Sequence, residues 1–167
     1  MTASFHHLLT TKLYLMNIDE QLDRFSSRTK EFQDVLATIP EAHRYTSVAE
    51  GWSAAFVVHH LADAELHFTS RFLHAIGDIN PNIVPFDEEA YPERVNYALR
   101  RVKTSLAAIV GVRALAYEIL TNATEADWNK VSNHPDLGSV TLAQIVDRAD
   151  KHMESHTQQL REIAANF

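Results

Sequence analysis

The stretch WSAAFVVHHLADAELHFTSRFLHAI, residues 52–76, decides the fold of this chain. Placed on an α-helix, it has apolar side chains around much of the circumference, so most of its sides need a covering neighbour. Ser53 is a favourable N-cap at its start, and Gly77 is a favourable stop at its end. The stretch therefore predicts a long helix that is buried among other helices.

Apolar residues with helical spacing predict three more long helices around this one. They span residues 18–39, 92–120 and 142–164. Pro40 ends the first of them, and residues 1–16 precede it as a candidate helical leader. Pro92 is acceptable at the first position of a helix, and Thr141 with Gln144 forms a capping box before the last one.

The segments between these helices predict loops. Residues 78–92 contain three prolines and predict a crossover loop. Residues 124–128 predict a short turn, and residues 134–138 predict another loop. No segment has the alternation of apolar and polar residues that is typical of a strand. We therefore predict an all-α fold: a single-domain four-helix bundle over residues 1–167, with a long crossover loop after its second helix.

The composition excludes several classes of function. The chain has no cysteine, which excludes a disulfide framework, a catalytic thiol and a thiolate metal site. Its net charge of −7 argues against a nucleic-acid partner. Residues 1–15 lack the pattern of a signal peptide, and no run reaches the length of a membrane span, so we expect a cytoplasmic protein with no membrane partner. The ten histidines are an unusual number, and imidazole is a common metal ligand.

Two of the histidines, His152 and His156, lie at the edge of the apolar face of the last helix. Side chains four residues apart stack one turn above the other, and two such imidazoles can bind one ion. The alternative is a pair of polar histidines at the boundary of a helix face.

The helix over residues 52–76 carries a stripe of ionisable side chains within about 60° of one another. Its members are His60, Asp63, His67, Arg71 and His74. Because the rest of the helix is largely apolar, the stripe is expected to face the bundle interior or a cavity, where ionisable groups need a partner or a metal. The alternative is a stripe that faces water between two neighbouring helices.

A series of short motifs follows in a fixed order over residues 52–160. They are WS at 52–53, HHLADAE at 59–65, Arg71, PFDEEAY at 85–91, HPD at 134–136 with TL at 141–142, and the ending H-x3-H-x2-QL from His152. Together these motifs resemble the DinB/YfiT-like superfamily of metal-binding four-helix bundles. Glu65 occupies a position that is histidine in YfiT-type members and glutamate in others, which leaves the subfamily open.

The resemblance implies that His60, His152 and His156 bind one divalent metal ion. Three imidazoles leave coordination positions for water or substrate, as in catalytic sites, whereas a structural zinc site has four protein ligands. Zinc is the expected metal, and nickel and manganese are alternatives.

The family also implies a metal-dependent enzyme that acts on a small-molecule substrate, and a homodimer. It is either an S-transferase that uses a low-molecular-weight thiol of the bacillithiol type, or a metal-dependent hydrolase. Because the chain has no cysteine, the thiol has to come from a cosubstrate. The alternative is a non-catalytic bundle that binds metal or a small ligand.

Seven further residues are candidates for the site. Glu65 and Asp63 are expected to orient a ligand imidazole or to accept a proton. The expected substrate pocket consists of His67, Arg71, Asp87, Tyr91 and Arg113. The charged members have structural alternatives. The two acids pair with Arg71 or with an N–H group, Asp87 is a helix N-cap, and Arg113 pairs with Glu118 or with an acid of the helix over residues 52–76.

Overall fold

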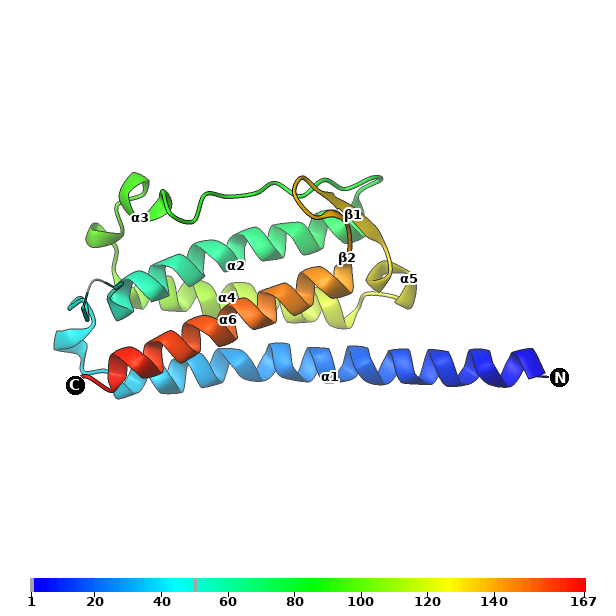
Figure 1. Ribbon diagram of the computed structural model, residues 1–167, viewed down its shortest axis with the longest axis horizontal. Coiled ribbons are helices and arrows are strands. Elements are labelled where there is room, and N and C mark those ends of the chain that lie inside the picture. The colour runs from blue at the N-terminus through cyan, green and yellow to red at the C-terminus, as the bar shows by residue number, and fades with distance from the viewer. Residues whose placement is uncertain (1, 50) are drawn as a thin grey trace.

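Four long helices form the body of the protein (Figure 1). They are α1 (Thr2–Thr38), α2 (Ala54–Gly77), α4 (Val102–Thr121) and α6 (Leu142–Ala164). The structure is a computed structural model that describes residues 2–49 and 51–167, with side chains from residue 18 onward. The predicted four-helix bundle is confirmed. The first predicted helix and its leader form one continuous helix, α1.

Local capping fixes the starts of α2 and α6 as predicted. The Ser53 hydroxyl accepts a hydrogen bond from the backbone N–H of Phe56 at 3.3 Å. At the start of α6, Thr141 and Gln144 form the expected capping box. At the end of α2, however, Gly77 is the last helical residue and does not adopt a positive φ; the extended Asp78 is the C-cap.

The long loop after α2 sets the topology. α1 and α2 each pack against both α4 and α6. In Figure 1, the loop returns along the bundle, so that α2 and α4 run in the same direction. Side-by-side parallel helices require a crossover of this kind, and the predicted crossover is therefore confirmed.

The core consists of two apolar clusters with polar side chains between them. One cluster lies where α2 ends and α6 begins, and the other lies where α2 begins and α6 ends. On each long helix, a polar residue stands near the boundary between the clusters: Thr29, Glu65, Arg113 and Asp150. The bundle thus contains a polar layer at mid-height.

The predicted helix over residues 92–120 is wrong at its start. The chain instead forms a short helix α3 (Tyr91–Arg94) and a 3-10 turn η2 (Tyr97–Leu99) before α4. Asn96 between them has a left-handed backbone, with φ of 54°. This break lets Arg100 reach back to Asp63 of α2 at 2.7 Å, a long-range ion pair that local periodicity does not reveal.

A small hairpin was also not predicted. Strand β1 (Val131–His134) pairs antiparallel with β2 (Gly138–Thr141). Four residues a strand are too few for an alternating pattern to emerge from the sequence. The hairpin anchors the crossover loop, because Ile83 N–H donates to Asn133 O at 2.8 Å and Asn133 N–H donates to Pro81 O at 2.9 Å. The predicted turn before it is the one-turn helix α5 (Glu125–Trp128).

Among the helices of the described chain, α4 alone is long and apolar enough to cross a membrane, judged by length and composition. The expectation that no run has this property was therefore wrong. In the bundle, α4 packs against α1 and α2 and buries the Arg113 side chain on its inner face. This is the arrangement of a bundle helix.

Candidate metal centre

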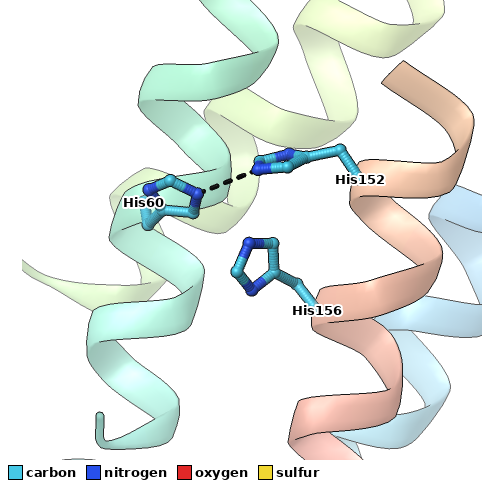
Figure 2. A group of neighbouring side chains, drawn as sticks. All are labelled: His60, His152 and His156. Atoms are coloured by element: carbon cyan, nitrogen blue, oxygen red, sulfur yellow. Dashed lines mark hydrogen bonds between the residues drawn. The ribbon is translucent and has the colours of Figure 1, made fainter. Parts of the chain in front are cut away.

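Three histidines from α2 and α6 face one another (Figure 2). His60 Nε2 and His152 Nε2 are 3.1 Å apart. The ring centroids of these two residues are 5.0 Å apart, and His156 lies 4.6 Å from each. One nitrogen of each ring lies within 4.8 Å of the other two. The three side chains therefore form a single cluster between the two helices.

Helix geometry explains why these three histidines meet. His152 and His156 are one turn apart on α6, so both rings lie on the side that faces α2. His60 of α2 is fully buried against them. The adjacent His59 is rotated by about 100°, and its Nδ1 pairs with Ser105 Oγ of α4 at 2.8 Å. A shift of one residue thus separates a member of the cluster from a structural histidine.

Two neighbouring side chains fix the orientation of the rings. His156 Nδ1–H donates a hydrogen bond to Gln159 Oε1 at 2.8 Å. The lone pair of the His156 ring is then on Nε2. The centroid of the Trp52 indole lies 5.1 Å from that of the His60 ring. It lies 6.4 Å from the centroid of the His156 ring, and the two planes are parallel to within 6°. Trp52 therefore forms an apolar wall on one side of the cluster.

Burial favours the neutral form of His60 and His156. Burial, and after it the nearby His156 and His152, lowers the pKa of His60 to about 4. The pKa of His156 is lowered as well, by burial and then by His152. A neutral imidazole has the lone pair that metal coordination requires.

One carboxylate stands at the edge of the cluster. Glu88 Oε2, from the crossover loop, lies 3.7 Å from His60 Nε2 and 3.9 Å from His152 Nε2. Its contact with His152 lowers the pKa of the Glu88 carboxyl against the opposing effect of burial. At neutral pH an ionised, half-exposed carboxylate therefore lies beside the histidine cluster.

The donor set fits a divalent metal ion. Nitrogens that bind one Zn²⁺ at 2.0–2.1 Å lie within about 4.2 Å of one another. The three nitrogens here lie within 4.8 Å, so small side-chain rotations bring them into range. The ring nitrogens on the far side, Nδ1 of His60 and of His152, are buried and have no hydrogen-bond partner within the described residues.

A cavity of about 500 Å³ adjoins the cluster at His152. Phe68, Phe86 and Ile145 contribute to its apolar wall. Its polar wall includes Glu88 and three cationic side chains, which are Arg71, Arg148 and Lys151. The volume suits a small molecule and not a polymer chain.

Residues 21–160 match the sequence model of the DinB superfamily. The chain belongs to the DinB superfamily. This DinB-superfamily chain is 29% identical over 106 residues to a candidate metal-dependent hydrolase of Oceanobacillus iheyensis. That match covers 64% of the chain and 61% of the relative's length.

Two solved structures share the fold of this DinB-superfamily chain. YfiT from Bacillus subtilis, described as a probable metal-dependent hydrolase with an unusual four-helix bundle topology, matches with a TM-score of 0.81 at 22% identity; the match covers 89% of this chain and 86% of YfiT. The mycothiol-dependent maleylpyruvate isomerase matches with a TM-score of 0.71 at 15% identity, covering 86% and 60%. At these identities the similarity establishes the fold alone.

The structure separates the predicted pocket residues of this DinB-superfamily protein. Arg71 lines the cavity beside His152. His67 and Tyr91 line a second cavity, of about 370 Å³, where His67 Nε2 lies 3.1 Å from the Tyr91 hydroxyl. Asp87 is exposed and accepts a hydrogen bond from the backbone N–H of Ala90 at 3.2 Å.

The two carboxylates predicted as catalytic are engaged with arginines. Asp63 accepts hydrogen bonds from Arg100 at 2.7 and 2.9 Å and from the Tyr97 hydroxyl at 3.0 Å. Glu65 is fully buried and pairs with Arg113 at 2.8 Å. This pair matches the structural alternative in which Arg113 meets an acid of α2. A catalytic role for either carboxylate stays a prediction.

Four residues near the cluster were not identified from the sequence. Glu88, Arg148 and Lys151 line the cavity, and Gln159 orients His156. Glu88 and Gln159 both lie inside the motifs that carry the family resemblance, which is the signal that could have found them. Arg148 lies four residues before His152 on α6 and Lys151 directly before it, but a surface helix carries many such cations.

Proposed function

We propose that this protein is a divalent-metal-dependent enzyme that acts on a small molecule. One observation carries the proposal: three imidazoles converge beside a cavity of about 500 Å³ that His152 lines. A divalent ion held by His60, His152 and His156 would supply a Lewis acid that lowers the pKa of a water or thiol at an open position. Zinc suits this ligand set, and nickel and manganese are alternatives.

The surrounding residues have distinct tasks in this proposal. Glu88 is ionised and lies within 4 Å of two of the rings, so it accepts the proton that the water or thiol loses. Gln159 holds the His156 ring in the tautomer that presents Nε2. Trp52 and Phe86 limit the access of water to the histidine cluster. Their ring centroids lie 5.1 and 6.4 Å from the centroid of the His60 ring.

Two reactions use this arrangement. In thiol S-transfer, the sulfur of a bacillithiol-type cosubstrate forms a bond to an electrophilic carbon, a leaving group departs with its bonding electrons, and Glu88 takes the thiol proton. In hydrolysis, water replaces the thiol and a scissile ester or amide bond breaks. The thiol requirement of the isomerase that shares the fold supports the first reaction, and the description of the Oceanobacillus relative supports the second.

The test is an activity screen of the metal-loaded protein. One arm offers bacillithiol with monochlorobimane, and the other offers esters and amides without a thiol. We expect turnover in one arm that is lost on chelation and restored by metal. Turnover without thiol would refute S-transfer, and inactivity in both arms with metal bound would favour a non-catalytic metal-binding bundle.

A matched pair of acids tests the proton acceptor. Glu88→Gln is expected to lower kcat by about 10²-fold or more while the metal stays bound. Glu89→Gln, the exposed neighbour in the same loop, is the control and is expected to leave kcat unchanged. Equal activity of the two variants would remove Glu88 from the mechanism.

A homodimer and a cytoplasmic location stay predictions.

A further inference from the structure

The cavity beside His152 has a cationic wall. Arg71, Arg148 and Lys151 all line it, although the chain as a whole has a net charge of −7. Lys151 is paired with Asp147 at 2.7 Å. Within the described residues, neither Arg71 nor Arg148 has a carboxylate oxygen within 4.0 Å, whereas six other arginines do. The two guanidinium groups thus line the cavity without an ion-pair partner in the part of the chain that the structure describes.

Arg71 is held in place despite this unfavourable environment. Its Nη2 donates to the backbone oxygen of Val84 at 3.1 Å, and its guanidinium carbon lies 5.2 Å from the centroid of the Phe68 ring and 5.8 Å from that of Phe86. Its Nε is buried without a hydrogen-bond partner among the described residues. Burial, and then the charge of Arg148, lowers the pKa of Arg71. A held guanidinium with an unused donor, beside a second guanidinium, is expected at an anion site.

The acidic residues of the wall are placed differently. Glu88 lies beside His60 and His152, at the histidine end of the cavity. Asp136 is 78% exposed and lies 4.0 Å from His134. Neither is within ion-pair distance of Arg71 or Arg148, so both guanidinium groups are available to a ligand.

We propose that the cavity binds a small ligand through an oxyanion, a carboxylate or a phosphate, held between Arg71 and Arg148. The ligand's apolar part packs on Phe68, Phe86 and Ile145. That the reacting end of the same molecule points at the three histidines rests on the proposed function. The anion site itself does not, because it is formed by residues outside the histidine cluster.

Calorimetric titration of the metal-loaded full-length protein tests the anion site. The probes are succinate, inorganic phosphate and the neutral succinamide. We expect succinate or phosphate to bind and succinamide not to bind. The anion that binds identifies the oxyanion as a carboxylate or a phosphate. Arg148→Gln is expected to weaken binding about tenfold or more, as the loss of a charge-assisted hydrogen bond does. The control Arg101→Gln removes an exposed arginine outside the cavity and is expected to leave binding unchanged.

Arg71→Gln is expected to behave like Arg148→Gln, but it also removes the hydrogen bond to Val84, so Arg148→Gln is the cleaner variant. Absence of binding by both anions, or binding that Arg148→Gln leaves unchanged, would overturn the proposal. Repeating the titration on metal-free protein separates the two proposals. Anion binding that persists there supports the anion site even if metal-dependent activity fails. Metal-loaded activity without Arg148-dependent anion binding leaves the enzyme proposal intact and removes the anion site.

Discussion

Two groups of polar side chains lie within two turns of each other on α2, and their surroundings are opposite. Around Arg113, every guanidinium nitrogen has an acceptor: Nη1 donates to Glu65 at 2.8 Å, Nε donates to Thr29 at 2.9 Å, and Nη2 donates to Phe25 O at 2.6 Å. The second carboxylate oxygen of Glu65, Oε2, is buried without a hydrogen-bond partner among the described residues. The guanidinium carbon also lies 3.7 Å from the centroid of the Phe25 ring. The side chains of Arg113 and Glu65 are both buried in the bundle.

The histidine cluster is open by comparison. No described carboxylate comes closer than 3.7 Å to His60 or His152, and the far ring nitrogens of both residues have no hydrogen-bond partner. The cluster adjoins the cavity of about 500 Å³ at His152, whereas Arg113 and Thr29 line a separate cavity of about 310 Å³ with their hydrogen bonds already made to each other and to Glu65. An ion pair with further hydrogen bonds holds the fold together, whereas imidazole nitrogens that converge with no carboxylate closer than 3.7 Å are available to a ligand.

The largest effect should come from opening the arginine group. Arg113→Ala leaves the Glu65 carboxylate buried without its counter-ion, and we expect the free energy of unfolding to fall by about 3–5 kcal/mol. Urea denaturation at neutral pH measures this loss. The double variant Glu65→Leu with Arg113→Met should recover most of it, because well-packed apolar residues replace a buried pair at little cost. A loss below about 1 kcal/mol in Arg113→Ala would mean that water reaches the pair, and the contrast with the histidines would fail.

A smaller effect should come from disturbing the open cluster from its edge. Gln159→Leu removes the acceptor for His156 Nδ1, and metal affinity should fall about 10- to 100-fold, with little change in stability. Competition titration against a chelating dye measures the affinity. Gln158→Leu, the exposed neighbour on the same turn, is the matched control. Equal metal affinity in the two variants would show that the contact with Gln159 does not orient the ring.

The smallest effect on stability concerns Glu31 of α1, which forms ion pairs with Arg28 and Arg161. Hydrogen bonds from Arg161 and then Arg28 lower the pKa of Glu31 below its ordinary 4.5. A lowered carboxyl pKa stabilises the fold above the ordinary value, and this contribution is lost as pH falls through the folded-state value. Because the side chain is 35% exposed, we expect the free energy of unfolding of wild type to exceed that of Glu31→Gln by less than about 1 kcal/mol at pH 7 and to match it once the carboxyl is protonated in both the folded and the unfolded state. A difference that grows as the pH falls would contradict this assignment.

Parts of the fold were accessible from the sequence because their causes are local. Ser53 and the box of Thr141 and Gln144 set helix starts by contacts within one turn. The break before α4 depends on Arg100 meeting Asp63, which is 37 residues away, so periodicity alone extended that helix too far. The hairpin strands are too short to carry a pattern.

The candidate site divides in the same way. The spacing of His152 and His156 predicts that they share a face, and the family resemblance selected His60 over His59; the structure brings the three together. The sequence left the partner of Arg113 open, since several acids were within reach. The role of Glu88 also could not be derived from periodicity, because it lies on the crossover loop, whose path is fixed by hydrogen bonds between Ile83, Pro81 and Asn133.

The most direct test of the account is a metal titration of three proteins: wild type, His60→Ala and His59→Ala. The substitutions are chemically identical and adjacent, but His60 faces the cluster and His59 faces Ser105. We expect wild type and His59→Ala to bind one divalent ion per chain tightly, and His60→Ala to lose tight binding while its circular dichroism stays helical. Full metal occupancy in folded His60→Ala would contradict the three-histidine centre.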